Sequence, residues 1–163
     1  MIGSDHELDK TSIERDLDCL RVLGLDPIDK EPELFVTEEE EQWAREKLGE
    51  LKVDPVKKLI MIHPLCSQNH KNWGMERFVK LSQYLINDCG HQVMGIFSLQ
   101  EQSVADLLQE QVDGIFIYVG PIRPSMALIQ QADLMVDNCS GPSHISVALQ
   151  VPTIILMGVD FKN

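Results

Sequence analysis

Five short apolar runs alternate with helix-like segments between Leu59 and Met157, and this alternation limits the folds open to the chain. Apolar runs of this length suit strands buried on both faces, and the segments between them carry the spacing of amphipathic helices. Regular alternation forms βαβ units, so the predicted fold class is α/β, a Rossmann-like open parallel sheet with helices on both faces. The predicted strands are 59–62, 92–97, 115–119, 134–137 and 153–157, and the predicted helices are 37–51, 75–89, 100–111, 125–132 and 142–149.

The first 36 residues lack this alternation. They predict one helix, beginning at Ser4 or Asp5 and stopped by Gly24, followed by a polar connection that holds two prolines. We therefore divide the chain into a helix with a linker, 1–36, and a Rossmann-like domain, 37–163. The domain is expected to be cut short at its C-terminal end, because one more crossover should follow the fifth strand.

Length and charge narrow the classes of function. A chain of 163 residues has the size of one domain and can bury a core. The net charge of −12 argues against a nucleic-acid partner, since phosphate contacts need a basic surface. No apolar run approaches the roughly 20 residues that cross a bilayer, and no signal peptide is visible. The four cysteines lie far apart without a CxxC pair, so we expect reduced thiols in a cytoplasmic protein and no metal site.

Ligands of open parallel sheets bind beyond the carboxyl ends of the strands, near the point where the strand order reverses. Four loops of the predicted sheet reach that edge: 63–73, 98–101, 120–124 and 138–142. None of them contains G-x-G-x-x-G or G-x-x-x-x-G-K-[ST]. This absence disfavours nicotinamide-dependent dehydrogenases and P-loop nucleotide hydrolases.

Two of these loops carry residues suited to phosphate. Lys71 stands just ahead of a helix, where its ammonium group can face a diphosphate; the alternative is a solvated lysine. In the second loop Gly141 allows close backbone approach, Pro142 fits a first helical turn, and free N–H groups of a helix start bind anions. The alternative there is an ordinary helix start. His144 either faces a ligand or caps nearby carbonyl groups, and both interpretations stay open.

Together the two loops resemble glycosyltransferase family 9, the bacterial heptosyltransferases of lipopolysaccharide core assembly. The family's first pattern, a strand ending in His-Pro and then Lys-x-Trp-x-x-Glu-x-Phe, matches His63-Pro64 and the residues from Lys71 to Phe78. Its second pattern, Asn-Asp-[Ser/Thr]-Gly-Pro-x-His, is similar to the stretch from Asn138 to His144. The resemblance covers nearly the whole chain but only about the C-terminal half of a family member.

The resemblance implies a GT-B architecture, in which two Rossmann-like domains face each other across a cleft. The C-terminal domain binds the nucleotide-sugar, most often ADP-heptose, without a metal ion or another cofactor. On this basis a lysine contacts the diphosphate and the small-residue turn receives the phosphates through its N–H groups. The candidate binding residues are Lys71, Ser140, Gly141, Pro142 and His144, with Glu101, for a ribose hydroxyl, and Asp137 as weaker candidates.

The resemblance also implies a second half. In the family, the N-terminal domain holds the acceptor site, for a lipid-linked glycan, and the catalytic acidic base, so no catalytic residue is expected in this chain. The complete reaction is displacement of ADP from the sugar by an acceptor hydroxyl, at the inner face of the bacterial plasma membrane. The chain alone is expected to bind nucleotide weakly and to transfer sugar negligibly.

The chain departs from the family pattern at two places. Cys139 stands where the family has aspartate, and Asp137, two positions earlier, points the same way on a strand. Gly158 is followed by Val159 and Asp160 instead of a small hydroxyl residue. A second hypothesis is therefore a non-catalytic α/β binding or interaction module. Another GT-B enzyme, such as a sugar-nucleotide epimerase, is a third hypothesis that explains the paired motifs less well.

Overall fold

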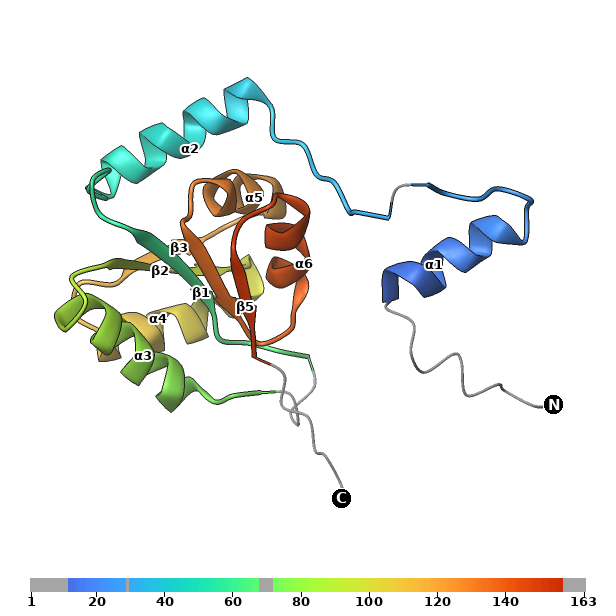
Figure 1. Cartoon of the computed structure of the whole chain (residues 1–163). Coiled ribbons are helices and arrows are strands. Elements are labelled where there is room, and N and C mark those ends of the chain that lie inside the picture. The colour runs from blue at the N-terminus through green and yellow to red at the C-terminus, as the bar shows by residue number, and fades with distance from the viewer. Residues whose placement is uncertain (1–11, 29, 68–71, 157–163) are drawn as a thin grey trace, which may run out of the picture. The chain divides into compact units, whose positions relative to one another are not determined.

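The computed structural model describes residues 12–28, 30–67 and 72–156, and the chain forms two compact units, Met1–Glu33 and Leu34–Asn163 (Figure 1). In the first unit, α1 (Ser12–Arg21) ends in a turn where Gly24 has a φ of +76°, which confirms the predicted stop. The predicted start of this helix lies outside the described residues. No helix in the described ranges is long and apolar enough to cross a membrane.

The second unit contains a five-stranded parallel sheet, which confirms the predicted Rossmann-like fold. The strands follow the order β3-β2-β1-β4-β5, so the chain builds outward from β1 to β3 and then returns to the other side of β1. The strand order thus reverses between β1 and β4. The strands are β1 (Leu59–His63), β2 (Gln92–Phe97), β3 (Phe116–Val119), β4 (Leu134–Asp137) and β5 (Thr153–Ile155).

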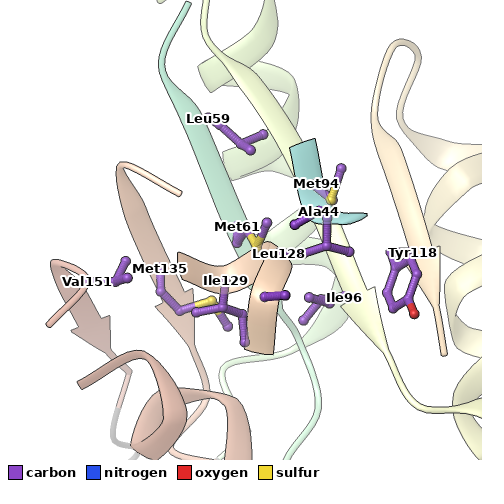
Figure 2. Close-up of a cluster of buried hydrophobic side chains, with 11 residues drawn as sticks. Ala44, Leu59, Met61, Met94, Ile96, Tyr118, Leu128, Ile129, Met135 and Val151 are labelled. Carbon is purple, nitrogen blue, oxygen red and sulfur yellow. The ribbon is translucent and has the colours of Figure 1, made fainter. Parts of the chain in front are cut away.

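Helices cover both faces of the sheet (Figure 1). Because side chains alternate along a strand, Leu59 and Met61 of β1 pack on one face, and Ile60 and Ile62 on the other. Figure 2 shows the first of the two buried clusters, in which Ala44 of α2 meets methionine and isoleucine side chains. That face is covered by α2 (Glu38–Glu50), α5 (Ile122–Gln130) and α6 (Gly141–Ala148), and the other face by α3 (Met75–Asn87) and α4 (Gln102–Gln111).

Two helices start two or three residues from their predicted positions. The helix α5 begins at Ile122 and not at Ser125, because Pro124 fits the first turn, where backbone N–H groups need no helical partner. The Ser125 hydroxyl donates back to the carbonyl of Pro121, at 3.0 Å, and is not a cap. The helix predicted from residue 100 is divided into a short 3₁₀ turn, η3 (Leu99–Glu101), and α4.

Candidate functional site

A pocket of about 530 Å³ opens at the carboxyl edge of the sheet, where the four predicted loops meet. Each of these loops contributes residues to its wall, which combines isoleucine and phenylalanine side chains with serine hydroxyls. The volume lies within the usual range of small-molecule sites, about 300–1,000 Å³. The lining residues are His63, Leu65, Cys66, Ser67, Ile96, Phe97, Ser98, Glu101, Gly120, Ile122, Ser125, Ile129, Ser140, Gly141, Pro142 and Ile145.

The turn between β4 and α6 is built around Asp137, the last residue of β4. Its Oδ2 accepts hydrogen bonds from the backbone N–H groups of Ser140, at 3.0 Å, and Ser143, at 2.9 Å. Cys139 has a φ of +59°, in the left-handed region, and Ser140 follows it as the N-cap of α6. The carboxylate therefore holds both sides of the turn that enters the helix.

These bonds correct one expectation from the sequence. The start of α6 was expected to offer several free N–H groups to a phosphate, but Asp137 occupies those of Ser140 and Ser143, and Pro142 has none. Gly141, the first residue of α6, keeps an N–H group that has no partner within the described residues. The helix start therefore offers one backbone donor, and the carboxylate behind it offsets the positive end of the helix dipole.

His63 lies beside Asp137, because the two residues are register partners on adjacent strands. Its Nδ1 is 3.1 Å from Asp137 Oδ1 and 2.9 Å from the Oγ of Ser140. The Ser140 hydroxyl itself donates to Asp137, at 2.8 and 2.9 Å from the two carboxylate oxygens. Since neither partner has a further hydrogen to give, Nδ1 carries the hydrogen and donates it to them.

Asp137 keeps its charge although its side chain is completely buried. Burial raises the pKa of this carboxyl, but hydrogen bonding and attraction to His63, together with the bonds from Ser140, outweigh burial and hold its pKa below the ordinary value. Asp137 does not line the pocket. Its place in the structure is that of a buried anion which orders the turn behind the pocket wall.

Glu101 faces the other side of the His63 ring. Its Oε1 lies 3.5 Å from the Nε2 of His63, and its Oε2 accepts a hydrogen bond from the backbone N–H of Ser98 at 2.7 Å. The Glu101 side chain is 28% exposed and lines the pocket. The His63 ring therefore lies between two carboxylates, one from β4 and one from the turn after β2.

Asn138 joins the loop after β1 to the loop after β4. Its amide nitrogen donates to the carbonyl of Pro64, at 2.6 Å, and to Oδ1 of Asn72, at 3.0 Å. Its Oδ1 accepts a hydrogen bond from the backbone N–H of Trp73 at 3.0 Å. Because Asn138 is completely buried, these bonds have little competition from water. They fix the loop on both sides of residues 68–71.

The structure places four of the seven predicted site residues in the pocket wall. His144 is exposed on α6 and does not line the pocket, and Asp137 lies behind the wall. Lys71, and likewise Gly158 to Asp160, fall outside the described residues. The four lining residues are Glu101, Ser140, Gly141 and Pro142.

The sequence interpretation assigned no role to His63 or to the hydroxyls of Ser67, Ser98 and Ser125. A signal for His63 was present, because the alternation from Leu59 through Met61 places it on the same face as Asp137. The serines carry no comparable signal, since serine is common in loops of every kind.

The four cysteines are free thiols. Cys66 lines the pocket, and its Sγ lies 3.7 Å from the carbonyl oxygen of Cys139. In the part of the chain that the structure describes, no three His, Cys, Asp or Glu side chains are arranged to hold a metal ion.

The solved structures to which this chain is similar include glycosyltransferases. The chain is similar to the glycosyltransferase family 9 protein of Veillonella parvula DSM 2008, with 21% identity and a TM-score of 0.77 over 90% of this chain and 44% of that one. It is similar to Escherichia coli ADP-heptose lipopolysaccharide heptosyltransferase II, with 22% identity and a TM-score of 0.66 over 80% and 41% of the chains. It also matches E. coli heptosyltransferase WaaC with ADP-2-deoxy-2-fluoro heptose, with 19% identity and a TM-score of 0.55 over 61% and 32%.

The chain thus spans less than half the length of these structures. A comparison with curated protein sequences finds no significant match. The family model of glycosyltransferase family 9 (heptosyltransferase) matches residues 5–160, nearly the whole sequence. The chain belongs to glycosyltransferase family 9.

Proposed function

We propose that this chain is the half of a glycosyltransferase that binds the nucleotide-sugar. The observation that carries the proposal is the pocket at the reversal of strand order, to which the loops after β1, β2, β3 and β4 all contribute. Nucleotides bind at this position in doubly wound sheets, because the loops on the two sides of the reversal diverge and leave a crevice. An ADP-sugar is the expected ligand, since E. coli WaaC is described with ADP and with an ADP-heptose analogue.

The wall of the pocket has groups for each part of such a ligand. Apolar side chains such as Ile96 and Ile129 suit a nucleobase, and Glu101 can accept hydrogen bonds from ribose hydroxyls. For the diphosphate we propose Lys71 and the free N–H group of Gly141. Ser140, whose hydroxyl donates to Asp137, would shape the turn beside them. His144 is exposed on α6 next to the lining residue Ile145 and does not itself line the pocket, so we give it no defined contact with the ligand.

Transfer itself requires more than this chain in our proposal. Residues 1–36 would connect the domain 37–163 to an N-terminal GT-B half that holds the lipid-linked glycan acceptor and the catalytic base. The acceptor oxygen would attack the anomeric carbon, the bond to the diphosphate would break, and ADP would leave. We place this reaction at the cytoplasmic face of the plasma membrane, and we expect the isolated chain to bind ADP without transferring sugar.

A non-catalytic binding or interaction module is the second candidate. It is favoured by Cys139, which occupies with a thiol the position where the family pattern has a carboxylate. A module that has lost the donor site in this way would not bind ADP. Calorimetry with ADP therefore separates the two candidates: saturable heat at ADP concentrations up to about 1 mM, corresponding to about −4 kcal/mol, supports the first.

Replacing Lys71 with alanine is expected to weaken ADP binding by about 1.5–3 kcal/mol, the usual contribution of one charge-assisted hydrogen bond. Isothermal titration of both proteins measures the difference. Lys80→Ala is the matched control, because Lys80 is an exposed lysine on α3 that does not line the pocket. Equal affinities of the wild type and Lys71→Ala would remove Lys71 from the site while leaving the pocket as the binding site.

A further inference from the structure

Protonation of His63 would change the charge of the pocket. Among the lining residues that the structure describes, Glu101 is the one carboxylate and His63 the one basic side chain. His63 is 5% exposed, so water screens its charge only weakly. With a neutral imidazole the wall carries one negative charge, in addition to Asp137 behind it; with an imidazolium the charges of the wall cancel.

Both nitrogens of the ring face a carboxylate. Nδ1 already carries a hydrogen, which it shares between Asp137 and Ser140. Nε2 faces Oε1 of Glu101 at 3.5 Å, so a neutral ring would direct a lone pair at a carboxylate. A protonated ring instead gives this carboxylate a donor. The titratable groups that face the ring in the described structure are Asp137 from β4 and Glu101 after β2, with the thiol of Cys66 in the adjoining wall.

We propose that His63 is a positioning residue that, when protonated, fixes Glu101 and Ser140 in the pocket and couples the binding of an anionic nucleotide to proton uptake at Nε2. This inference rests on the proposed function, since it concerns the same pocket. A diphosphate brings negative charge toward a wall whose described lining residues sum to zero charge only with His63 protonated. The ligand therefore favours the imidazolium, and by linkage the imidazolium favours the ligand.

The test compares ADP affinity across pH in the wild type and in His63→Gln. An imidazole gains its positive charge as the pH falls from about 8 to about 5.5. Over this fall in pH, the affinity of the wild type for ADP is expected to rise by about five- to tenfold more than the affinity of His63→Gln. Titration of ADP itself affects all proteins equally and cancels in the comparison. Calorimetry of the wild type in two buffers of different ionisation enthalpy should show net proton uptake, which His63→Gln loses.

The control is His91→Gln, because His91 immediately precedes β2 and so lies at the amino edge of the sheet, away from the pocket. Replacing the buried His63 can also change stability. Glu101→Gln therefore serves as a second variant, because the Glu101 side chain is more exposed than that of His63. It should shift the pH dependence to lower pH while circular dichroism shows an intact fold.

The possible results separate this inference from the proposed function. If the wild type does not bind ADP at any pH, the nucleotide pocket itself is refuted. If the wild type binds ADP, but His63→Gln and Glu101→Gln keep its pH dependence and its proton uptake, the role of His63 is refuted and the pocket stands.

Discussion

Replacing Asp137 with alanine is expected to lower the free energy of unfolding by about 3–5 kcal/mol, because it removes a buried charge and leaves its several hydrogen-bond donors without an acceptor. The carboxylate is completely buried and accepts hydrogen bonds from Ser140 and Ser143, and it faces the Nδ1 of His63. Removing it leaves these donors without an acceptor in a region that water cannot easily reach. Urea denaturation followed by tryptophan fluorescence measures the loss.

The dependence of this effect on pH has a definite sign. The pKa of Asp137 in the folded protein lies below its ordinary value, so the carboxylate contributes stability above the ordinary range of a carboxyl group. The contribution is lost as the pH falls through the folded-state pKa. The difference between wild type and Asp137→Ala should therefore be full at about pH 7 and shrink in acid below about pH 4.

Asp113→Ala is the control for this substitution, because Asp113 is an exposed carboxylate just after α4. It should change stability by no more than about 0.5 kcal/mol. Asp137→Asn keeps one oxygen acceptor, so its loss of unfolding free energy should lie between those of Asp137→Ala and Asp113→Ala. A loss in Asp137→Ala no larger than in Asp113→Ala would show that Asp137 does not hold the turn.

The second large effect is expected for Asn138→Ala, which should destabilise the fold by about 2–4 kcal/mol through unsatisfied buried polar groups. The substitution leaves the carbonyl of Pro64 and the N–H group of Trp73 without their partner. Because these residues flank the segment that contains Lys71, the variant should also bind ADP more weakly than its loss of stability alone explains.

Hydrogen exchange tests the hydrogen bonds between Asn138 and the loop after β1 at a single residue. The Trp73 amide should exchange faster in Asn138→Ala, since Asn138 Oδ1 accepts its hydrogen bond. Asn87→Ala is the matched control, as Asn87 is an exposed asparagine at the end of α3. Unchanged exchange at Trp73, or a loss of stability equal to that of the control, would contradict the role given to Asn138.

Most of the fold followed from the sequence because hydrophobic periodicity determines it. Apolar runs such as 59–62 and 92–97 became strands at the predicted positions, since a strand buried on both faces must be apolar throughout. The start of α5 was predicted incorrectly, because Ser125 was expected to begin the helix and Pro124 to belong to the preceding loop. Within a first turn proline has no helical bond to break, so the helix extends three residues before Ser125.

The site was less predictable, because its geometry depends on contacts between residues far apart in the chain. Because a loop begins where its strand ends, the sequence predicted that the loops with Glu101 and Ser140 lie at the same edge of the sheet. The pocket lies at that edge, and both residues line it. The use of the helix-start donors by Asp137 did not follow from the sequence. A carboxylate at the end of a strand can face solvent, a ligand or its own turn, and only the packing against His63 decides among these.

Amide NMR spectra recorded during an ADP titration test the nucleotide pocket most directly, since they report the binding position residue by residue. The pocket predicts saturable shifts of amides from all four loops, among them Ser67, Ser98, Gly120 and Gly141. The chemical shifts of amides at the amino edge of the sheet, such as that of His91, should not change. The absence of any shift, or shifts confined to that opposite edge, would contradict a nucleotide pocket at the reversal of strand order.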